Sequence, residues 1–339
     1  MKEIVEPLLQ WFAENRREFP WRKDKEPYHV WVSEIMLQQT RIEAVLSYYK
    51  RFMDVLPDVQ ALSEIEDDAL LKLWEGLGYY SRARNLKKAA QMIVNEYQGI
   101  FPSTFEEIRK LPGVGDYTAG AIASICFNEP VPAVDGNVLR VISRVTESND
   151  NVLLPQTKKK VTNELSSIMP DASGEFNEAL MELGETVCMP NTAPTCSICP
   201  LSELCRAYLN DLTGVLPVRI KKTKRRCEEL SVFILEAPDG TIALEKRKAS
   251  GLLSGMYQFP NIKGYYSDKE LFSFLNKWDL KPVQISFLLE AKHVFTHIDW
   301  FMKGYRVRVN NKIDRYIWVS PEELKSDYPL PTAFQIILR

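Results

Sequence analysis

The sequence lacks any long hydrophobic run. Its longest largely apolar, uncharged stretch spans residues 117–128, whereas a helix that crosses a bilayer needs about 20 such residues. The first residues mix acids among their apolar side chains, unlike the apolar core of a secretory signal. We therefore expect a soluble, cytoplasmic protein that is not secreted and does not bind membranes.

An excess of basic charge is also missing. The 43 Lys and Arg residues are balanced by 45 Asp and Glu, for a net charge of −2. Binding to nucleic acid, if it occurs, must therefore come from local positive surfaces that neutralise phosphates. The composition, 45% hydrophobic and 26% charged, is that of a globular protein of about two domains.

Disulfide-like spacing is absent among the six cysteines. Four of them, Cys188, Cys196, Cys199 and Cys205, fall in one short segment, which is typical of a metal site. A structural zinc usually takes two separate CxxC pairs, whereas this segment has one, so the spacing favours an iron-sulfur cluster and leaves zinc as the alternative. We expect this 188–205 loop to stabilise the fold.

The hydrophobic period divides the chain into two domains. Apolar residues recur every three or four positions across residues 1–213, predicting an all-α domain, and every second position in several runs of 229–339, predicting an α+β domain. The basic segment between them, 214–228, is predicted to be a linker. It is either a solvated tether or a contact to a phosphate backbone.

A turn with alternate glycines joins two predicted helices at residues 111–120, LPGVGDYTAG. Gly113 and Gly115 allow a partner close to the backbone, and their N–H groups with the next helix N-terminus can bind a phosphate. This pattern predicts a helix-hairpin-helix; the alternative is an ordinary tight turn between helices.

Two acidic residues stand out. Asp135 follows an apolar run and precedes a helical segment, as an ordinary N-cap does. Glu34 has Val30, Trp31 and Leu37 on the same helical face, which should raise the pKa of its carboxyl group. The alternative for Glu34 is a first-turn residue that interacts with the helix dipole after Ser33.

These motifs, in this order, resemble the helix-hairpin-helix DNA glycosylase superfamily with its iron-sulfur loop, and within it the adenine DNA glycosylase (MutY) family. The resemblance extends over FPWR, PYHVWVSEIMLQQTR, WEGLGYYSRARNL, LPGVGDYTAGAI, PAVDGNVLRV, FNEALMELG and the cysteine loop, then GLLSGMYQFP and HVFTH. It implies a 4Fe-4S cluster on the four cysteines.

The resemblance also implies roles for individual residues. Asp135 matches the catalytic aspartate, with Asn137 beside it, and Glu34 matches the acid that protonates adenine. Cleavage of an N-glycosidic bond builds positive charge on the sugar and negative charge on the base, so it needs one ionised carboxylate and one protonated carboxyl group. Further matches are Trp21, Arg22 and Glu178 in the adenine pocket, and Gln39 and Tyr79 as residues that probe the duplex.

Tyr117 separates two subfamilies. Members that also nick DNA carry a lysine at the start of the helix after the hairpin, whereas this chain has Tyr117. The resemblance therefore implies a monofunctional glycosylase.

The second domain resembles the Nudix-like recognition domain of the family, without the acidic residues of the Nudix box that bind magnesium. We expect it to bind and not to hydrolyse. HVFTH matches the loop that recognises 8-oxoguanine, through Thr296 and His297, with threonine replacing the usual serine. A metal pair formed by His293 and His297 is disfavoured because no third ligand is evident.

The function implied is removal of adenine opposite 8-oxoguanine or guanine in double-stranded DNA, during base-excision repair, by a monomeric enzyme. One alternative is an oxidised-pyrimidine glycosylase that also nicks the strand. The other is a non-catalytic, metal-stapled DNA-binding module, which Glu34 and Asp135 together disfavour.

Overall fold

The computed structural model describes residues 1–190, 192–220, 225–248 and 250–338. The chain divides into two compact units, the first made of Met1–Glu64 and Asn85–Lys222 and the second of Ile65–Arg84 and Thr223–Arg339. The predicted linker 214–228 includes residues 221–224, which lie outside the described residues, and its last part already belongs to a strand that begins at Arg226.

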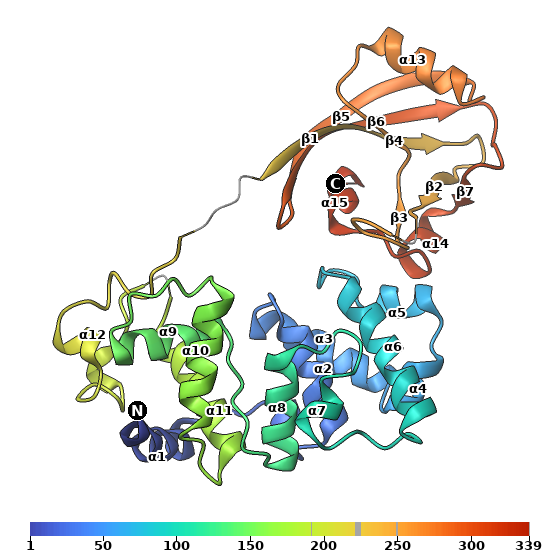
Figure 1. Cartoon of the computed structure of the whole chain (residues 1–339). Helices are drawn as coiled ribbons and strands as arrows, with labels where there is room; N and C mark the ends of the chain where they lie inside the picture. The colour runs from blue at the N-terminus through green and yellow to red at the C-terminus, as the bar shows by residue number, and fades with distance from the viewer. Residues whose placement is uncertain (191, 221–224, 249, 339) are drawn as a thin grey trace. The chain divides into compact units, whose positions relative to one another are not determined.

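Helices form every regular element of the described residues up to Leu209 (Figure 1). They are α1 (Val5–Asn15), α2 (Pro27–Leu37), α3 (Ile42–Val55), α4 (Val59–Glu64), α5 (Asp67–Leu73), α6 (Ser81–Glu96), α7 (Phe105–Ile108), α8 (Asp116–Phe127), α9 (Gly136–Thr146), α10 (Pro155–Ser166), α11 (Ser173–Thr186) and α12 (Arg206–Leu209).

Local sequence explains where these helices begin and end. Pro27 and Pro155 open α2 and α10, at the first helical position where a missing N–H costs nothing. Helix α8 ends at Phe127, and the left-handed backbone of the next residue, Asn128 (φ 55°), closes the last turn. The predicted hairpin is confirmed, since a turn over 111–115 separates α7 from α8, although α7 is only one turn long.

The core of the first unit joins its N-terminal helix to helices from much later in the chain. Ile4, Leu8 and Phe12 are fully buried in one cluster with Phe176 and Leu180 of α11. Residues of α9 and α10 also belong to this cluster. This core fixes α9 and α11 relative to each other, and both helices contribute to the cavity described below.

The second unit is built on a mixed sheet of order β3-β2-β1-β6-β5, with β4 paired to β1 and β7 to β2. Its strands are β1 (Arg226–Glu236), β2 (Ile242–Lys246), β3 (Tyr257–Gln258), β4 (Asn261–Lys263), β5 (Pro282–Val294), β6 (Ile298–Val309) and β7 (Ile317–Val319), and its later helices are α13 (Asp268–Lys277), α14 (Pro321–Ser326) and α15 (Thr332–Gln335). The expected α+β class is confirmed.

Both faces of this sheet are covered, by α13 on one side and α15 on the other (Figure 1). Alternate residues of β1 therefore enter two different cores: Val232 and Ile234 pack with Phe334, whereas Phe233 and Leu235 pack with Leu271 of α13. Burial on both faces is why this strand is a continuous apolar run. In the described part of the chain, no helix is both long and apolar enough to cross a membrane.

Candidate active site

A cavity of about 680 Å³ in the first unit is lined by both of the acidic residues singled out from the sequence, Glu34 and Asp135. Four helices supply its polar groups: Glu34 comes from α2, Tyr117 from α8, Asp135 from the start of α9 and Glu178 from α11. Residues separated by about 140 positions in the sequence thus face one space of a size that suits a small-molecule or base pocket.

Glu34 is a buried carboxyl group, only 7% exposed. It lies in the third turn of α2, which begins at Pro27, so the alternative of a first-turn residue stabilised by the helix dipole is wrong. Burial raises the pKa of Glu34 to about 7, against the opposing hydrogen bond that Tyr117 Oη donates to its Oε2 at 2.7 Å. The group can therefore carry a proton near neutral pH.

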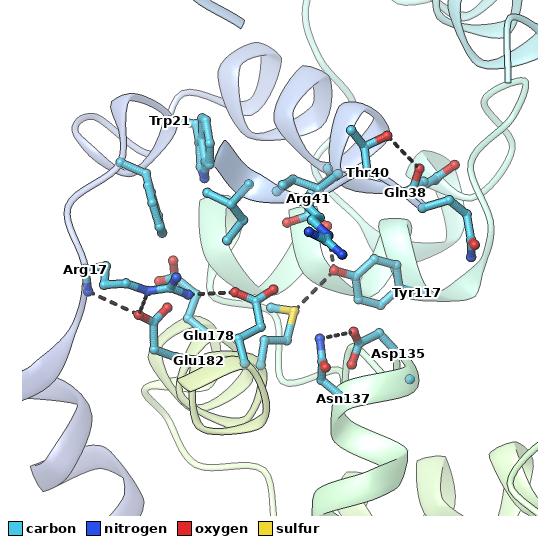
Figure 2. Close-up of a pocket in the computed structure, with 18 of the residues that line it drawn as sticks. Arg17, Trp21, Gln38, Thr40, Arg41, Tyr117, Asp135, Asn137, Glu178 and Glu182 are labelled. Atoms are coloured by element: carbon cyan, nitrogen blue, oxygen red, sulfur yellow. Dashed lines mark hydrogen bonds and ion pairs between the residues drawn. The ribbon is translucent and has the colours of Figure 1, made fainter. Parts of the chain in front are cut away.

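Asp135 is both a helix cap and a member of the cavity. Its Oδ1 accepts the backbone N–H of Val138 at 2.8 Å, and its Oδ2 accepts Nδ2 of Asn137 at 2.9 Å (Figure 2). Burial raises the pKa of Asp135, while these hydrogen bonds and the positive charge of Arg140 oppose that rise. The donors favour the ionised form, unlike the single donor facing Glu34.

Asn137 is held with its amide nitrogen toward Asp135. Arg140 donates from Nη2 to Asn137 Oδ1 at 2.8 Å, which leaves Nδ2 to donate to the aspartate. Gly184 of α11 provides the space, because a Cβ there would lie 2.6 Å from Cβ of Asn137. The network fixes where the carboxylate points.

The three residues expected in an adenine pocket also line this cavity. Trp21 is buried and stacks on Phe19, with ring centroids 5.0 Å apart. Arg22 Nε lies 2.8 Å from Glu178 Oε1. Burial raises the pKa of Glu178, and Arg22 opposes that rise.

The sequence reasoning missed several residues of the cavity wall. They are Arg17, Gln38, Lys158, Met181, Glu182 and Glu185. The sequence could have predicted two of them, because Glu182 and Glu185 follow Glu178 at helical spacing and so share its face of α11. Arg17 and Lys158 carry no such local pattern, because they reach the cavity only through the packing of their helices and loops.

The residues expected to meet DNA from the first unit are exposed. Gln39 lies at the end of α2 on the cavity wall, with a left-handed backbone (φ 61°) that is uncommon for a residue with a side chain. Gly113 is also left-handed (φ 79°), and Gly115 is the N-cap of α8. All three are on the surface, as contact with a duplex requires.

In the second unit, Tyr79 and Thr296 meet. Tyr79 is 48% exposed and left-handed (φ 48°), and its hydroxyl lies 3.0 Å from that of Thr296. Thr296 and His297 form the exposed turn between β5 and β6. Two residues that the resemblance assigned to DNA recognition, more than 200 positions apart, are therefore neighbours.

The four clustered cysteines line one small cavity beside α9. Arg144 points into it, with Nη1 3.2 Å from the sulfur of Cys188. The fit to a negatively charged iron-sulfur cluster is good, because such clusters take four thiolates and accept hydrogen bonds at sulfur. Cys126 and Cys227 lie elsewhere, on α8 and β1.

Across the described ranges, no group of three or more His, Cys, Asp or Glu side chains is arranged to hold one metal ion.

Comparison with protein families gives two matches. Residues 32–171 match the HhH-GPD superfamily of base excision DNA repair proteins, and residues 231–339 match the NUDIX domain. The first range holds Glu34, Tyr117 and Asp135, and the second holds Thr296.

Curated relatives match over most of the chain. An adenine DNA glycosylase of Buchnera aphidicola is 35% identical, over 91% of this chain and 86% of its own. The mouse adenine DNA glycosylase is also 35% identical, over 89% of this chain and 70% of its own.

Solved structures match the helical part. A thermostable thymine-DNA glycosylase is similar with a TM-score of 0.56 and 29% identity, over 62% of this chain and 96% of that one. A trapped endonuclease III–DNA covalent intermediate has a TM-score of 0.53 and 25% identity, over 62% of this chain and 99% of that one.

Proposed function

Since the chain belongs to the adenine DNA glycosylase family, we propose that it hydrolyses the N-glycosidic bond of adenine mispaired with 8-oxoguanine or guanine in duplex DNA, as a step of base-excision repair. The observation that carries the proposal is that Glu34 and Asp135 share one cavity but differ in environment. The same pair argues against a non-catalytic DNA-binding module, which has no use for a proton donor in a cavity.

In this mechanism Glu34 is the general acid. With a pKa of about 7, its carboxyl group is protonated on much of the enzyme at neutral pH and can give its proton to a ring nitrogen of the flipped adenine. Protonation makes the base a better leaving group. Tyr117 holds the Glu34 carboxyl group in place through its hydroxyl.

Asp135 stabilises the sugar as the base departs. Its carboxylate, fixed by Val138 and Asn137, offsets the positive charge of the oxocarbenium ion or bonds to it transiently. A water molecule then adds to the sugar and leaves an abasic site. Trp21, Arg22 and Glu178 bind the extruded base.

We assign base release without strand cleavage to this chain. Tyr117 occupies the position at which nicking relatives carry a lysine, and its hydroxyl is hydrogen-bonded to Glu34. Among the described residues that line the cavity, Lys158 is the one lysine, so its amine is the candidate nucleophile for a nicking activity. Strand cleavage before and after alkali separates the two activities.

Four thiolates, from Cys188, Cys196, Cys199 and Cys205, would hold a 4Fe-4S cluster. The cluster would cross-link the loop after α11 to α12 and stabilise the fold. The test is the colour, iron and sulfide content of the purified protein: four irons and four sulfides per chain support it, and one zinc per chain contradicts it.

Duplex contacts come from both units. The hairpin glycines Gly113 and Gly115 offer N–H groups to a phosphate, and Gln39 and Tyr79 enter the base stack when adenine is extruded. Thr296 and His297 recognise 8-oxoguanine on the opposite strand. We assign these contacts to a monomer that associates with DNA in the cytoplasm.

The direct test measures base release from duplexes that carry adenine opposite 8-oxoguanine, guanine, cytosine or thymine. We expect adenine release with 8-oxoguanine and guanine, and strand cleavage only after alkali. Release of an oxidised pyrimidine, with strand cleavage before alkali, would favour the nicking alternative.

A further inference from the structure

Three acids follow one face of α11 along the wall of the cavity. Glu178, Glu182 and Glu185 are spaced by four and then three residues, so their side chains lie in one row. Two arginines from the segment before α2, Arg17 and Arg22, form ion pairs with this row. Figure 2 shows Arg17 beside Glu182. The resemblance gave roles to Glu178 and Arg22 but none to Glu182.

Glu182 is the most deeply buried member of the row, with a side chain that is 1% exposed. Each of its oxygens takes a different arginine. Oε1 accepts Arg17 Nε and, at 3.3 Å, the Arg17 backbone N–H, while Oε2 accepts Arg22 Nη2 at 3.0 Å. A carboxylate this deeply buried is stable only with such partners, so its position and theirs are linked.

Arg22 is consequently shared between two carboxylates. Its Nε faces Glu178 Oε1 at 2.8 Å, its Nη2 faces Glu182 and its Nη1 donates to the carbonyl oxygen of Arg17 at 2.9 Å. All three nitrogens are occupied, so the plane of the guanidinium group is fixed. Only one of its nitrogens is available to Glu178.

This sharing leaves one oxygen of Glu178 unused. Within the described residues, Glu178 Oε2 has no hydrogen-bond partner. An arginine without a second carboxylate prefers to pair through two parallel hydrogen bonds with one carboxylate. Without Glu182, Arg22 would therefore turn to cover both oxygens of Glu178.

We propose that Glu182 is a positioning residue for base recognition. Because Glu182 binds Nη2 of Arg22, only Nε of Arg22 faces Glu178, and Glu178 keeps one oxygen free to accept a hydrogen bond from the exocyclic amine of adenine. The inference rests on the proposed function. A purine with a carbonyl group in place of the exocyclic amine would bring an acceptor against the free oxygen of Glu178, which is also an acceptor, and would be rejected. Glu182 thus affects specificity without touching the base.

The test compares adenine with purine that lacks the exocyclic amine, each opposite 8-oxoguanine, under single-turnover conditions. In Glu182→Gln, the amide keeps the shape but cannot accept from both arginines. We expect adenine release to slow by ~10-fold or more and the adenine-to-purine rate ratio to fall by a similar factor, because the substitution removes the hydrogen bond to the amine. Duplex affinity should change by less than about threefold, since phosphate contacts dominate it.

Glu175→Gln is the matched control. Glu175 lies on the same helix, pairs with Lys25 at 2.8 Å and has a 37% exposed side chain outside the cavity. Its rates and its rate ratio should equal those of the wild type. Glu182→Asp, which keeps the charge but shortens the side chain, serves as a second variant and should lower the ratio to a smaller extent.

The outcomes separate the two proposals. A folded Glu182→Gln protein, or a folded Glu182→Asp protein if the first does not fold, with an unchanged rate ratio would show that Glu182 only supports the structure. Failure of both variants to fold would lead to the same conclusion. A wild type that releases no adenine would overturn the proposed function, and the present inference with it.

Discussion

At the scale of single residues, two carboxyl groups of similar intrinsic acidity are placed in unequal environments. Glu34 is buried among apolar neighbours with one donor, the Tyr117 hydroxyl. Asp135 has a backbone donor, a side-chain amide and the charge of Arg140. Such inequality allows one cavity to hold an acid and an anion together.

Asp135→Asn should reduce base release by roughly a thousandfold, because the neutral amide cannot offset a cationic sugar. The amide can still accept the Val138 N–H, so α9 should stay capped and the fold intact. Single-turnover rates and duplex binding measure the two effects. Near-normal turnover with intact binding would remove Asp135 from the mechanism.

Tyr117→Phe tests the hydrogen bond to Glu34. The hydroxyl stabilises the ionised carboxylate and so lowers the pKa of Glu34 relative to what burial alone would give. Its removal should raise this pKa, so that the loss of activity on the alkaline side moves to higher pH. A pH-rate profile whose alkaline side does not move would show that the bond has no influence on the acid.

Sequence reasoning predicted the carboxylates but not their surroundings. The N-cap interpretation of Asp135 and the catalytic one are both compatible with its geometry, because the cap supplies the donors that hold the anion. The pairing of Glu182 with Arg17 was missed, since a partly buried ion pair across 165 positions leaves no local pattern in the sequence. Only the spacing of acids on α11 could have indicated Glu182.

At the scale of elements, the helix-hairpin-helix depends on two glycines for different reasons. Gly113 has a left-handed backbone, and a Cβ there would lie 2.6 Å from Cβ of Asn85. Gly115 has an ordinary extended backbone with nothing within 4 Å of an added Cβ. The fold therefore requires glycine at position 113, whereas it does not require glycine at position 115, where the absence of a side chain leaves room for a bound phosphate.

Gly113→Ala and Gly115→Ala form a matched pair. The first should lower the free energy of unfolding by roughly 1–3 kcal/mol through backbone strain and crowding. The second should leave stability within about 0.5 kcal/mol but weaken duplex binding, because its methyl group stands where a phosphate approaches. Thermal unfolding and binding titrations distinguish them; equal stability of the two variants would contradict this account.

The elements themselves followed closely from the sequence. Glycine- and proline-rich breaks near 76–78, 99–102, 111–115 and 130–132 all fall between observed helices. The Pro-Asp-Gly sequence at 238–240, typical of a turn between strands, joins antiparallel β1 and β2. The parallel pairing of β1 with β6 could not be predicted, because it joins strands about 70 residues apart with no turn to set their register.

At the scale of the whole molecule, the helical and mixed parts were predictable from hydrophobic period, but the extent of the second unit was not. Residues 65–84 belong to it. Asp68 accepts from both Lys246 and Tyr257, and Glu75 accepts the backbone N–H of Leu330 at 2.8 Å. Helical periodicity shows that a segment buries a face but not which core receives it.

Because residues 65–84 belong to the second unit, the Thr296 hydroxyl has a partner outside the mixed sheet, the hydroxyl of Tyr79. Thr296→Ala should reduce the preference for 8-oxoguanine over guanine opposite adenine about fivefold, the value of one hydrogen bond, while the rate with guanine stays near that of the wild type. Thr296→Ser, which retains the hydroxyl, should keep the preference. The preference is measured as the ratio of the base-release rates from the duplexes with 8-oxoguanine and with guanine. An equal loss of rate on the two duplexes would mean that the loop has only a structural role.

The most direct measurement of the central claim is the pH dependence of the single-turnover rate of adenine release opposite 8-oxoguanine. Glu34 must be protonated and its pKa is raised to about 7, so the rate should be highest below that pH and fall about tenfold per pH unit above it. Glu34→Gln should be nearly inactive at every pH. A wild-type rate that stays constant from pH 6 to about pH 9 would contradict the assignment of a proton-donating carboxyl group.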